Sequence, residues 1–99
     1  MVIYKYPLAM TDEQTVSLPM FAKILSFVVQ REQPVLYALI YEGEKRRVDV
    51  PVYFVGTGQQ LPTDVMSGNR IKAAYRTTLS FGDGSLMLHV FMTCKWEEI

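Results

Sequence analysis

The single histidine and the single cysteine are the residues of this chain best suited to covalent catalysis or zinc binding. They are His89 and Cys94. A Cys–His pair must lie within hydrogen-bond reach to act as nucleophile and base, and zinc needs about four such ligands. A separation of five residues places the two side chains on opposite faces of a regular strand. No further histidine or cysteine is present, so we expect no catalytic residue, no metal site and no cofactor.

A glycine-rich loop is the best candidate for ligand recognition. It begins with Gly56-Thr57-Gly58, and glycines allow backbone N–H groups to approach an anion closely. Nucleotide-binding fingerprints also need a third glycine or a Gly-Lys-Ser/Thr ending, followed by a helix. Pro62 opposes such a helix, so a strand-ending turn is the simpler interpretation. The ligand-binding hypothesis has these candidates, in a pocket between subunits: Thr57, Gly58, Gln59, Gln60, Arg70 and Lys72.

Charged residues are balanced, with ten basic and ten acidic side chains. A neutral chain has no overall field to attract nucleic acid or an anionic membrane. The densest basic run, residues 45–47, is flanked by Glu42 and Glu44, which is typical of a hairpin tip in water. Paired carboxylates occur near turns and near the C-terminus, where nothing raises their pKa for acid catalysis. We expect neither an enzyme nor a nucleic-acid-binding protein.

The hydrophobic pattern and the N-terminus predict where the protein acts. No apolar run approaches the roughly 20 residues of a membrane span. The N-terminus lacks the basic and apolar regions of a signal peptide, and one cysteine cannot form an intramolecular disulfide. These features predict a cytoplasmic protein without a membrane segment.

The elements that must position these residues are strands. Apolar residues alternate with polar ones between turns that contain glycine or proline. We expect strands at residues 2–6, 14–18, 24–30, 35–41, 48–54, 75–81 and 86–94. Residues 42–45 and 82–85 are expected to close hairpins, Pro51 to mark an edge or a bulge, and residues 63–66 have room for one helical turn. The sequence predicts one all-β domain over residues 1–99, a small antiparallel β-sandwich or a partly open barrel of about seven short strands.

Two apolar segments suggest a contact surface. Residues 35–41, which include Tyr37 and Tyr41, are apolar on both faces, so a second sheet or another subunit must cover both. Met20 and Phe21 follow a proline at a turn, and exposed methionine and aromatic side chains are common at adaptable interfaces. Two interpretations of Met20 and Phe21 stay open, a satellite core cluster and a partner-binding patch.

Separate pieces of the chain carry a resemblance to a known group of proteins. They are Tyr4-Lys5-Tyr6, Thr11-Asp12-Glu13-Gln14-Thr15, Ala22-Lys23-Ile24-Leu25-Ser26, Pro34-Val35-Leu36-Tyr37-Ala38-Leu39, Gly56-Thr57-Gly58 and Leu88-His89-Val90-Phe91. Together they resemble a family of small uncharacterised proteins from tailed bacteriophages and prophages. The resemblance implies a phage-encoded accessory protein in the bacterial cytoplasm and no established activity. This chain departs from the family at Met20-Phe21, where Lys-Gly is common, and at Gln59, where histidine is common.

These observations support three hypotheses about function. The favoured one is a non-enzymatic phage or prophage accessory protein that binds a host bacterial protein and self-associates into a homo-oligomer. Its partner-binding residues would be Met20, Phe21, Tyr37 and Tyr41. The second is a small-molecule or nucleotide-signal binding protein, a sponge that uses the glycine-rich loop. The third is a minor virion or assembly protein.

Overall fold

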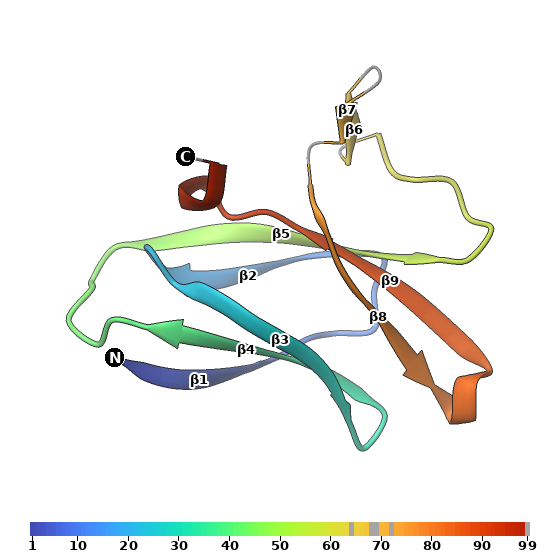
Figure 1. The fold of residues 1–99 in the computed structure, drawn as a ribbon, viewed down its shortest axis with the longest axis horizontal. Coiled ribbons are helices and arrows are strands. Elements are labelled where there is room, and N and C mark those ends of the chain that lie inside the picture. The colour runs from blue at the N-terminus through green and yellow to red at the C-terminus, as the bar shows by residue number, and fades with distance from the viewer. Residues whose placement is uncertain (64, 68–69, 72, 99) are drawn as a thin grey trace.

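The computed structural model describes residues 1–63, 65–67, 70–71 and 73–98, which form strands and short 3₁₀ turns (Figure 1). Seven strands have six to ten residues: β1 (Val2–Pro7), β2 (Glu13–Pro19), β3 (Lys23–Gln30), β4 (Gln33–Ile40), β5 (Arg47–Gly56), β8 (Tyr75–Phe81) and β9 (Leu86–Met92). Two strands have two residues each, β6 (Met66–Ser67) and β7 (Arg70–Ile71). The 3₁₀ turns are η1 (Gly82–Gly84) and η2 (Lys95–Glu98). The all-β prediction is confirmed.

The strands form two packed antiparallel sheets. One has three strands in the order β1-β4-β3, and the other has four in the order β2-β5-β9-β8; β6 and β7 pair separately. Edge strands β3 and β8 approach one another without forming a ladder in the described residues, so the sheets are not closed into a barrel. Within this described part, no helix is long and apolar enough to cross a membrane.

The core lies between the two sheets and is built by alternate residues of their central strands. Side chains that point inward come from β4, β5 and β9: Leu36, Ala38, Ile40, Val50, Val52, Phe54, Val90 and Met92. The alternation expected of residues 48–54 and 86–94 is therefore confirmed from Val50 to Phe54 and from Val90 to Met92, whereas Leu86 at the start of β9 is 42% exposed. Burying each large apolar side chain contributes about 1.5–3 kcal/mol, so these alternating rows hold the sheets together.

One predicted hairpin is confirmed and the other is wrong. Strands β8 and β9 pair across η1, where Gly82, Asp83 and Gly84 have positive φ. Residues 42–45 do not close a hairpin, because β4 and β5 belong to different sheets. Strand β4 already has β1 and β3 on its two edges, and β5 has β2 and β9, so neither strand has an edge for the other.

The remaining local predictions differ from the structure in detail. Pro51 lies in central strand β5 and not at a bulge, opposite Thr15 of β2. Since Phe54 N–H donates to the carbonyl of Asp12 on the β2 side, the Pro51 nitrogen faces the other way, where the β9 ladder ends at Val52. The expected helical turn near residue 63 is instead a turn in which Val65 N–H donates to Pro62, followed by β6; residue 64 lies outside the described residues.

Candidate functional site

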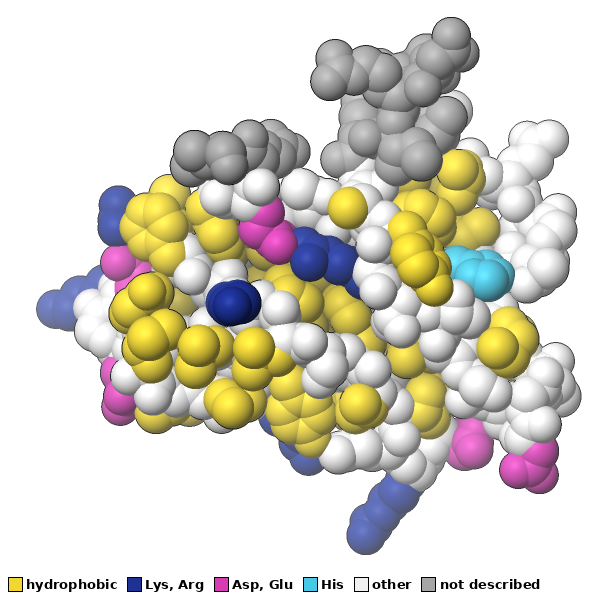
Figure 2. Space-filling view, viewed as in Figure 1, with side chains coloured by type: hydrophobic (Ala, Val, Ile, Leu, Met, Phe, Trp, Pro, Cys, Tyr) yellow, Lys and Arg dark blue, Asp and Glu magenta, His cyan; other side chains and the backbone are white. Residues whose placement is uncertain are grey.

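The face of the three-stranded sheet that points away from the core is apolar and uncovered by other described elements. Its rows follow the register of β1, β4 and β3, and we call it the outer face. It consists of Ile3, Leu39 and Lys23; Lys5, Tyr37 and Ser26; Pro7, Val35 and Val28; and a polar last row of Gln33 and Gln30. Ile3 is 59% exposed, and Tyr37, Leu39 and Val28 are half-buried. Figure 2 shows hydrophobic side chains gathered over these strands toward the N-terminus.

The two faces of β4 pack against different parts of the molecule. Its inward residues Leu36, Ala38 and Ile40 pack under the four-stranded sheet. On the outer face Val35 is only 2% exposed, because it lies between Pro7 of β1 and Val28 of β3. We predicted that both faces of this strand are covered. The second sheet covers the inward face, and no other described element covers the outer face.

Charge on the outer face is exclusively basic. Lys5 and Lys23 belong to its rows, and no Asp or Glu does. The Tyr37 hydroxyl accepts a hydrogen bond from Gln30 Nε2 at 2.7 Å, which fixes the tyrosine ring on this surface. Aromatic side chains are enriched in protein contact regions and lysine is depleted there, so Tyr37 and the apolar rows are the part of this face that resembles such a region.

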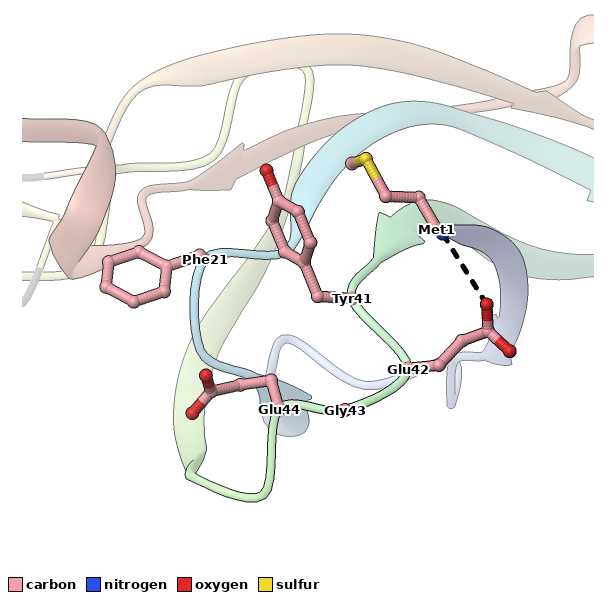
Figure 3. A pocket seen from close by; sticks show the side chains of 6 residues that line it. All are labelled: Met1, Phe21, Tyr41, Glu42, Gly43 and Glu44. Carbon is pink, nitrogen blue, oxygen red and sulfur yellow. Dashed lines mark hydrogen bonds and ion pairs between the residues drawn. The ribbon is translucent and has the colours of Figure 1, made fainter.

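The outer face continues at one end into a hollow of about 590 Å³ (Figure 3). Met1, Phe21 and Tyr41 line it, together with Glu42, Gly43 and Glu44. Tyr41 lies two residues beyond Leu39 and Met1 two residues before Ile3, so both continue the outer-face rows. The Met1 amino group is 3.5 Å from Glu42 Oε1, the contact drawn in Figure 3.

Phe21 is a strained surface residue, not core filler. It has φ 68°, a left-handed conformation that a bulky L-residue adopts rarely, and it is 44% exposed. Its ring meets the Trp96 indole edge-on at 6.4 Å, and Arg46 Cζ lies 5.3 Å from its centroid. Trp96 in turn donates from Nε1 to the Ala22 carbonyl at 2.7 Å. Met20 is half-buried and does not line the hollow.

The acidic and basic groups beside this hollow pair with one another. Arg46 Nε donates to Glu44 Oε1 at 2.5 Å. That hydrogen bond lowers the pKa of the half-buried Glu44 carboxyl and raises the pKa of the exposed Arg46 guanidinium. Glu44 therefore stays ionised and paired, and it is unsuited to general acid catalysis.

Of the four predicted partner-binding residues, the structure brings Phe21 and Tyr41 around one hollow and places Tyr37 on the same outer face. Met1 and Ile3 were not among the predicted contact residues, whereas Leu39 lies within the predicted segment 35–41. The alternation along residues 2–6 was the available indication. Ile3 and Lys5 share one face and Val2, Tyr4 and Tyr6 share the other, so both faces carry apolar side chains.

The glycine-rich loop meets His89 on the outside of the other sheet. Thr57 Oγ1 is 2.9 Å from His89 Nε2, and Thr78 Oγ1 is 2.8 Å from His89 Nδ1 and 2.8 Å from the Tyr75 hydroxyl. A hollow of about 290 Å³ opens there, lined by Val55, Gly56, Thr57, Gly58, Gln59, Leu61, Tyr75, His89 and Phe91. The loop and the histidine thus form one site that the sequence did not predict.

The predicted ligand-binding residues take different roles. Gln59 braces its own loop, since its Oε1 accepts from Gly56 N–H at 2.6 Å and its N–H donates to the Gly56 carbonyl. Gln60 is exposed and outside the hollow. The Arg70 side chain and Lys72 lie outside the described residues. The lining holds no lysine, arginine or carboxylate, so the described walls suit an uncharged ligand better than an anion.

Cys94 is buried away from His89 and is chemically quiet. It is 0% exposed, whereas His89 lies on the outer side of β9. Burial, together with the nearby Glu97 carboxylate, raises the pKa of the Cys94 thiol, which keeps it protonated and a poor nucleophile. Among the described residues, no group of three or more His, Cys, Asp or Glu is placed to hold a metal ion.

Fold and surface define a small two-sheet β protein with an apolar, basic sheet face. Residues 1–98 match the family described as "Domain of unknown function (DUF7352)", and the chain belongs to that family. No curated protein and no solved structure matches the chain.

Proposed function

We propose that this protein is a non-enzymatic binding protein whose working surface is the outer face of the three-stranded sheet with the adjoining Met1–Tyr41–Phe21 hollow. The main observation in support is that the rows of Ile3, Tyr37 and Leu39 lie on a sheet face that no other described element covers. Contiguous exposed apolar surface of this kind is typical of protein interaction sites.

Strain at Phe21 supports the same surface. Holding an aromatic residue at φ 68° costs free energy, about 1–2 kcal/mol for a left-handed L-residue. Such cost is common where the side chain serves a contact surface. The Phe21 ring is only partly used by Trp96 and Arg46, because 44% of the residue is still exposed.

The chemistry of the face defines its partner. Lys5 and Lys23 are its charged residues, so the matching surface is apolar with carboxylates at the positions that meet these two lysines. In keeping with the resemblance to bacteriophage accessory proteins, we take the partner to be a host bacterial protein in the cytoplasm.

The test is a binding titration with matched charge variants. Proteins that co-purify with the tagged chain from bacterial cells are identified, and each purified candidate is titrated against the wild type, Ile3→Glu and Thr15→Glu. Thr15 is exposed on an edge strand of the other sheet, so it is the control. We expect Ile3→Glu to weaken binding at least about tenfold and Thr15→Glu to leave it unchanged, because a buried unpaired carboxylate is costly. Equal affinities of wild type and Ile3→Glu would refute the proposed surface.

A second candidate function rests on the His89 site. Its hollow of about 290 Å³ is close to the lower end of ligand pockets, roughly 300 Å³. Aromatic Tyr75 and Phe91 stand beside the hydroxyl of Thr57 and the imidazole of His89. We propose that a ligand here would be small, planar and uncharged. A nucleobase or nucleoside that raises the melting temperature of the wild type but not of His89→Ala would support it, and an absence of any shift would remove it.

A further inference from the structure

The four edge strands of the two sheets differ in how well their free edges are protected. β3 has an irregular register between Ile24 and Ser26, and β8 between Tyr75 and Thr77. These two edges also lie against one another. β1 pairs with β4 without interruption over all six of its residues. A regular, uncovered edge is the kind to which another strand can add.

The edge of β2 is blocked by side chains of its own chain. Its odd-numbered residues point their backbone groups outward, because Phe54 N–H on β5 donates to Asp12. Thr11 Oγ1 donates to the Glu13 carbonyl at 3.2 Å, and Arg47 Nη2 donates to the Ser17 carbonyl at 2.7 Å. An incoming strand would have to displace both contacts.

The edge of β1 carries no such block among the described residues. Leu8 N–H donates to Pro34 on β4, so even-numbered residues of β1 face β4 and odd-numbered residues face outward. The outward backbone groups are those of Ile3 and Lys5, with the carbonyl of Pro7. The strand also carries exposed apolar side chains, with Ile3 59% and Tyr4 53% exposed.

The area that the chain exposes is larger than expected of a monomer. Its accessible surface is 6383 Å², for a mass of 11.4 kDa. A monomer of that mass exposes about 5,800 Å² by the usual scaling. The excess, about 600 Å², is comparable to the roughly 800 Å² that each subunit contributes to a standard interface. The chain is also flat, with extents of 41 × 37 × 17 Å.

We propose that two copies of this chain pair antiparallel through β1, with Tyr4 at the two-fold axis. In this register Ile3 lies opposite Lys5 of the second copy, and the two residues exchange backbone hydrogen bonds on both sides of the axis. A register shift toward the C-terminus would set Lys5 against the second copy's Lys5, a destabilising like-charge pair. It would also bring in Pro7, which has no N–H to donate.

The dimer extends the proposed function. The order β3-β4-β1 continues through the axis into the second copy, and both outer faces lie on the same side of the joined sheet. The dimer itself does not depend on the proposed function. Its use does, because the dimer would present two binding faces to one partner. Self-pairing and partner binding are measured separately, so either can fail alone.

Cysteine cross-linking tests the register. Tyr4 residues at the axis form a pair without mutual hydrogen bonds, whose Cα atoms are about 4.5 Å apart, a distance that suits a disulfide. The native Cys94 is 0% exposed, so Tyr4→Cys adds the reactive thiol. We expect Tyr4→Cys to form a disulfide-linked dimer under mild oxidation and the control Thr15→Cys, on the β2 edge, to form no intermolecular disulfide. Equal cross-linking of the two variants would overturn the proposal.

A proline variant tests the backbone pairing without cross-links. The Lys5 N–H faces outward, so Lys5→Pro leaves the β4 ladder intact, and its melting curve checks the fold. We expect sedimentation to show a wild-type dimer and at least about a tenfold larger dissociation constant for Lys5→Pro, because half of the inter-copy N–H donors are lost. A folded Lys5→Pro that dimerises like wild type would overturn the proposal. So would a wild type still monomeric at about 100 μM, above the micromolar range of weak specific interfaces.

Discussion

The Phe21 ring stands edge-on to the Trp96 indole, with centroids 6.4 Å apart and planes inclined at 60°. This contact joins the turn before β3 to the C-terminal 3₁₀ turn η2, and the Trp96 Nε1 hydrogen bond to Ala22 reinforces it. In this position the Phe21 backbone adopts a strained, left-handed conformation with a φ of 68°. One residue therefore combines a local strain with a contact between distant parts of the sequence.

Two substitutions at Phe21 separate the strain from the contact. Phe21→Ala and Phe21→Gly both remove the ring contacts with Trp96 and Arg46, but only glycine adopts positive φ without cost. We expect the glycine variant to be more stable than the alanine variant by about 1 kcal/mol, the reverse of the usual order. Urea unfolding measures both. An alanine variant as stable as the glycine variant would show that the backbone is not strained there.

His89 is predicted to hold the glycine-rich loop against the sheet, because one ring nitrogen contacts Thr57 of the loop and the other contacts Thr78 of β8. His89→Ala leaves the hydroxyls of Thr57 and Thr78 without the imidazole. Losing these hydrogen bonds should lower the free energy of unfolding by about 1–3 kcal/mol. Met87→Ala, an exposed neighbour on the same side of β9, is the control and should change it by less than about 0.5 kcal/mol. Equal effects of the two variants would contradict the role of His89.

Cys94 should make the stability of the protein fall at alkaline pH. Burial raises the pKa of this thiol in the folded state, so the unfolded chain releases its proton first, above a pKa of about 8.5. The free energy of unfolding is therefore unaffected by Cys94 ionisation below that pH. Above it, the free energy of unfolding declines by up to about 1.4 kcal/mol per pH unit. The measurement is the difference between wild type and Cys94→Ala in urea unfolding at successive pH values. A difference that does not change between pH 7 and pH 10 would contradict the prediction.

Glu97 should contribute stability with the opposite pH dependence. Burial would raise the pKa of its carboxyl, but hydrogen bonds from Arg76 and from the Cys94 N–H outweigh burial and lower it. The contribution of Glu97 to stability is present above the pKa of the unfolded chain, near 4.5. It is lost as the pH falls through the pKa of the folded state. Glu97→Gln should therefore cost about 1 kcal/mol at neutral pH, since the pair is partly exposed. The difference in unfolding free energy between wild type and Glu97→Gln should shrink in acid. A difference that grew in acid would contradict the lowered pKa of Glu97.

Period-two patterns were enough to predict most of the fold. Val50 and Val52, like Val90 and Met92, alternate with outward residues, as the predicted strands require, and all four side chains are buried in the core. The hairpin at residues 82–85 followed from its glycines, which adopt the positive φ that such a turn needs. Residues 42–45 have a similar composition but join two sheets, because strand order depends on long-range pairing that local composition does not contain.

The candidate site was less predictable for physical reasons. Phe21 is a poor residue for positive φ, so its conformation could not be inferred from its type. His89 and Thr57 are 32 residues apart and meet only because β5 and β9 are neighbours in one sheet. The uncovered side of β4 likewise became visible only when the second sheet was found on the opposite side.

The most direct test of the central claim is a chemical-shift map of the isotope-labelled protein with and without its purified partner. We predict that the largest shifts fall on the outer face, at Ile3, Tyr37, Leu39 and Val28, and in the hollow at Tyr41. Resonances of Thr15 and Asp49, on the outside of the other sheet, should stay in place. Shifts concentrated instead at Thr57 and His89, or on the β2–β5 side, would contradict the proposed surface.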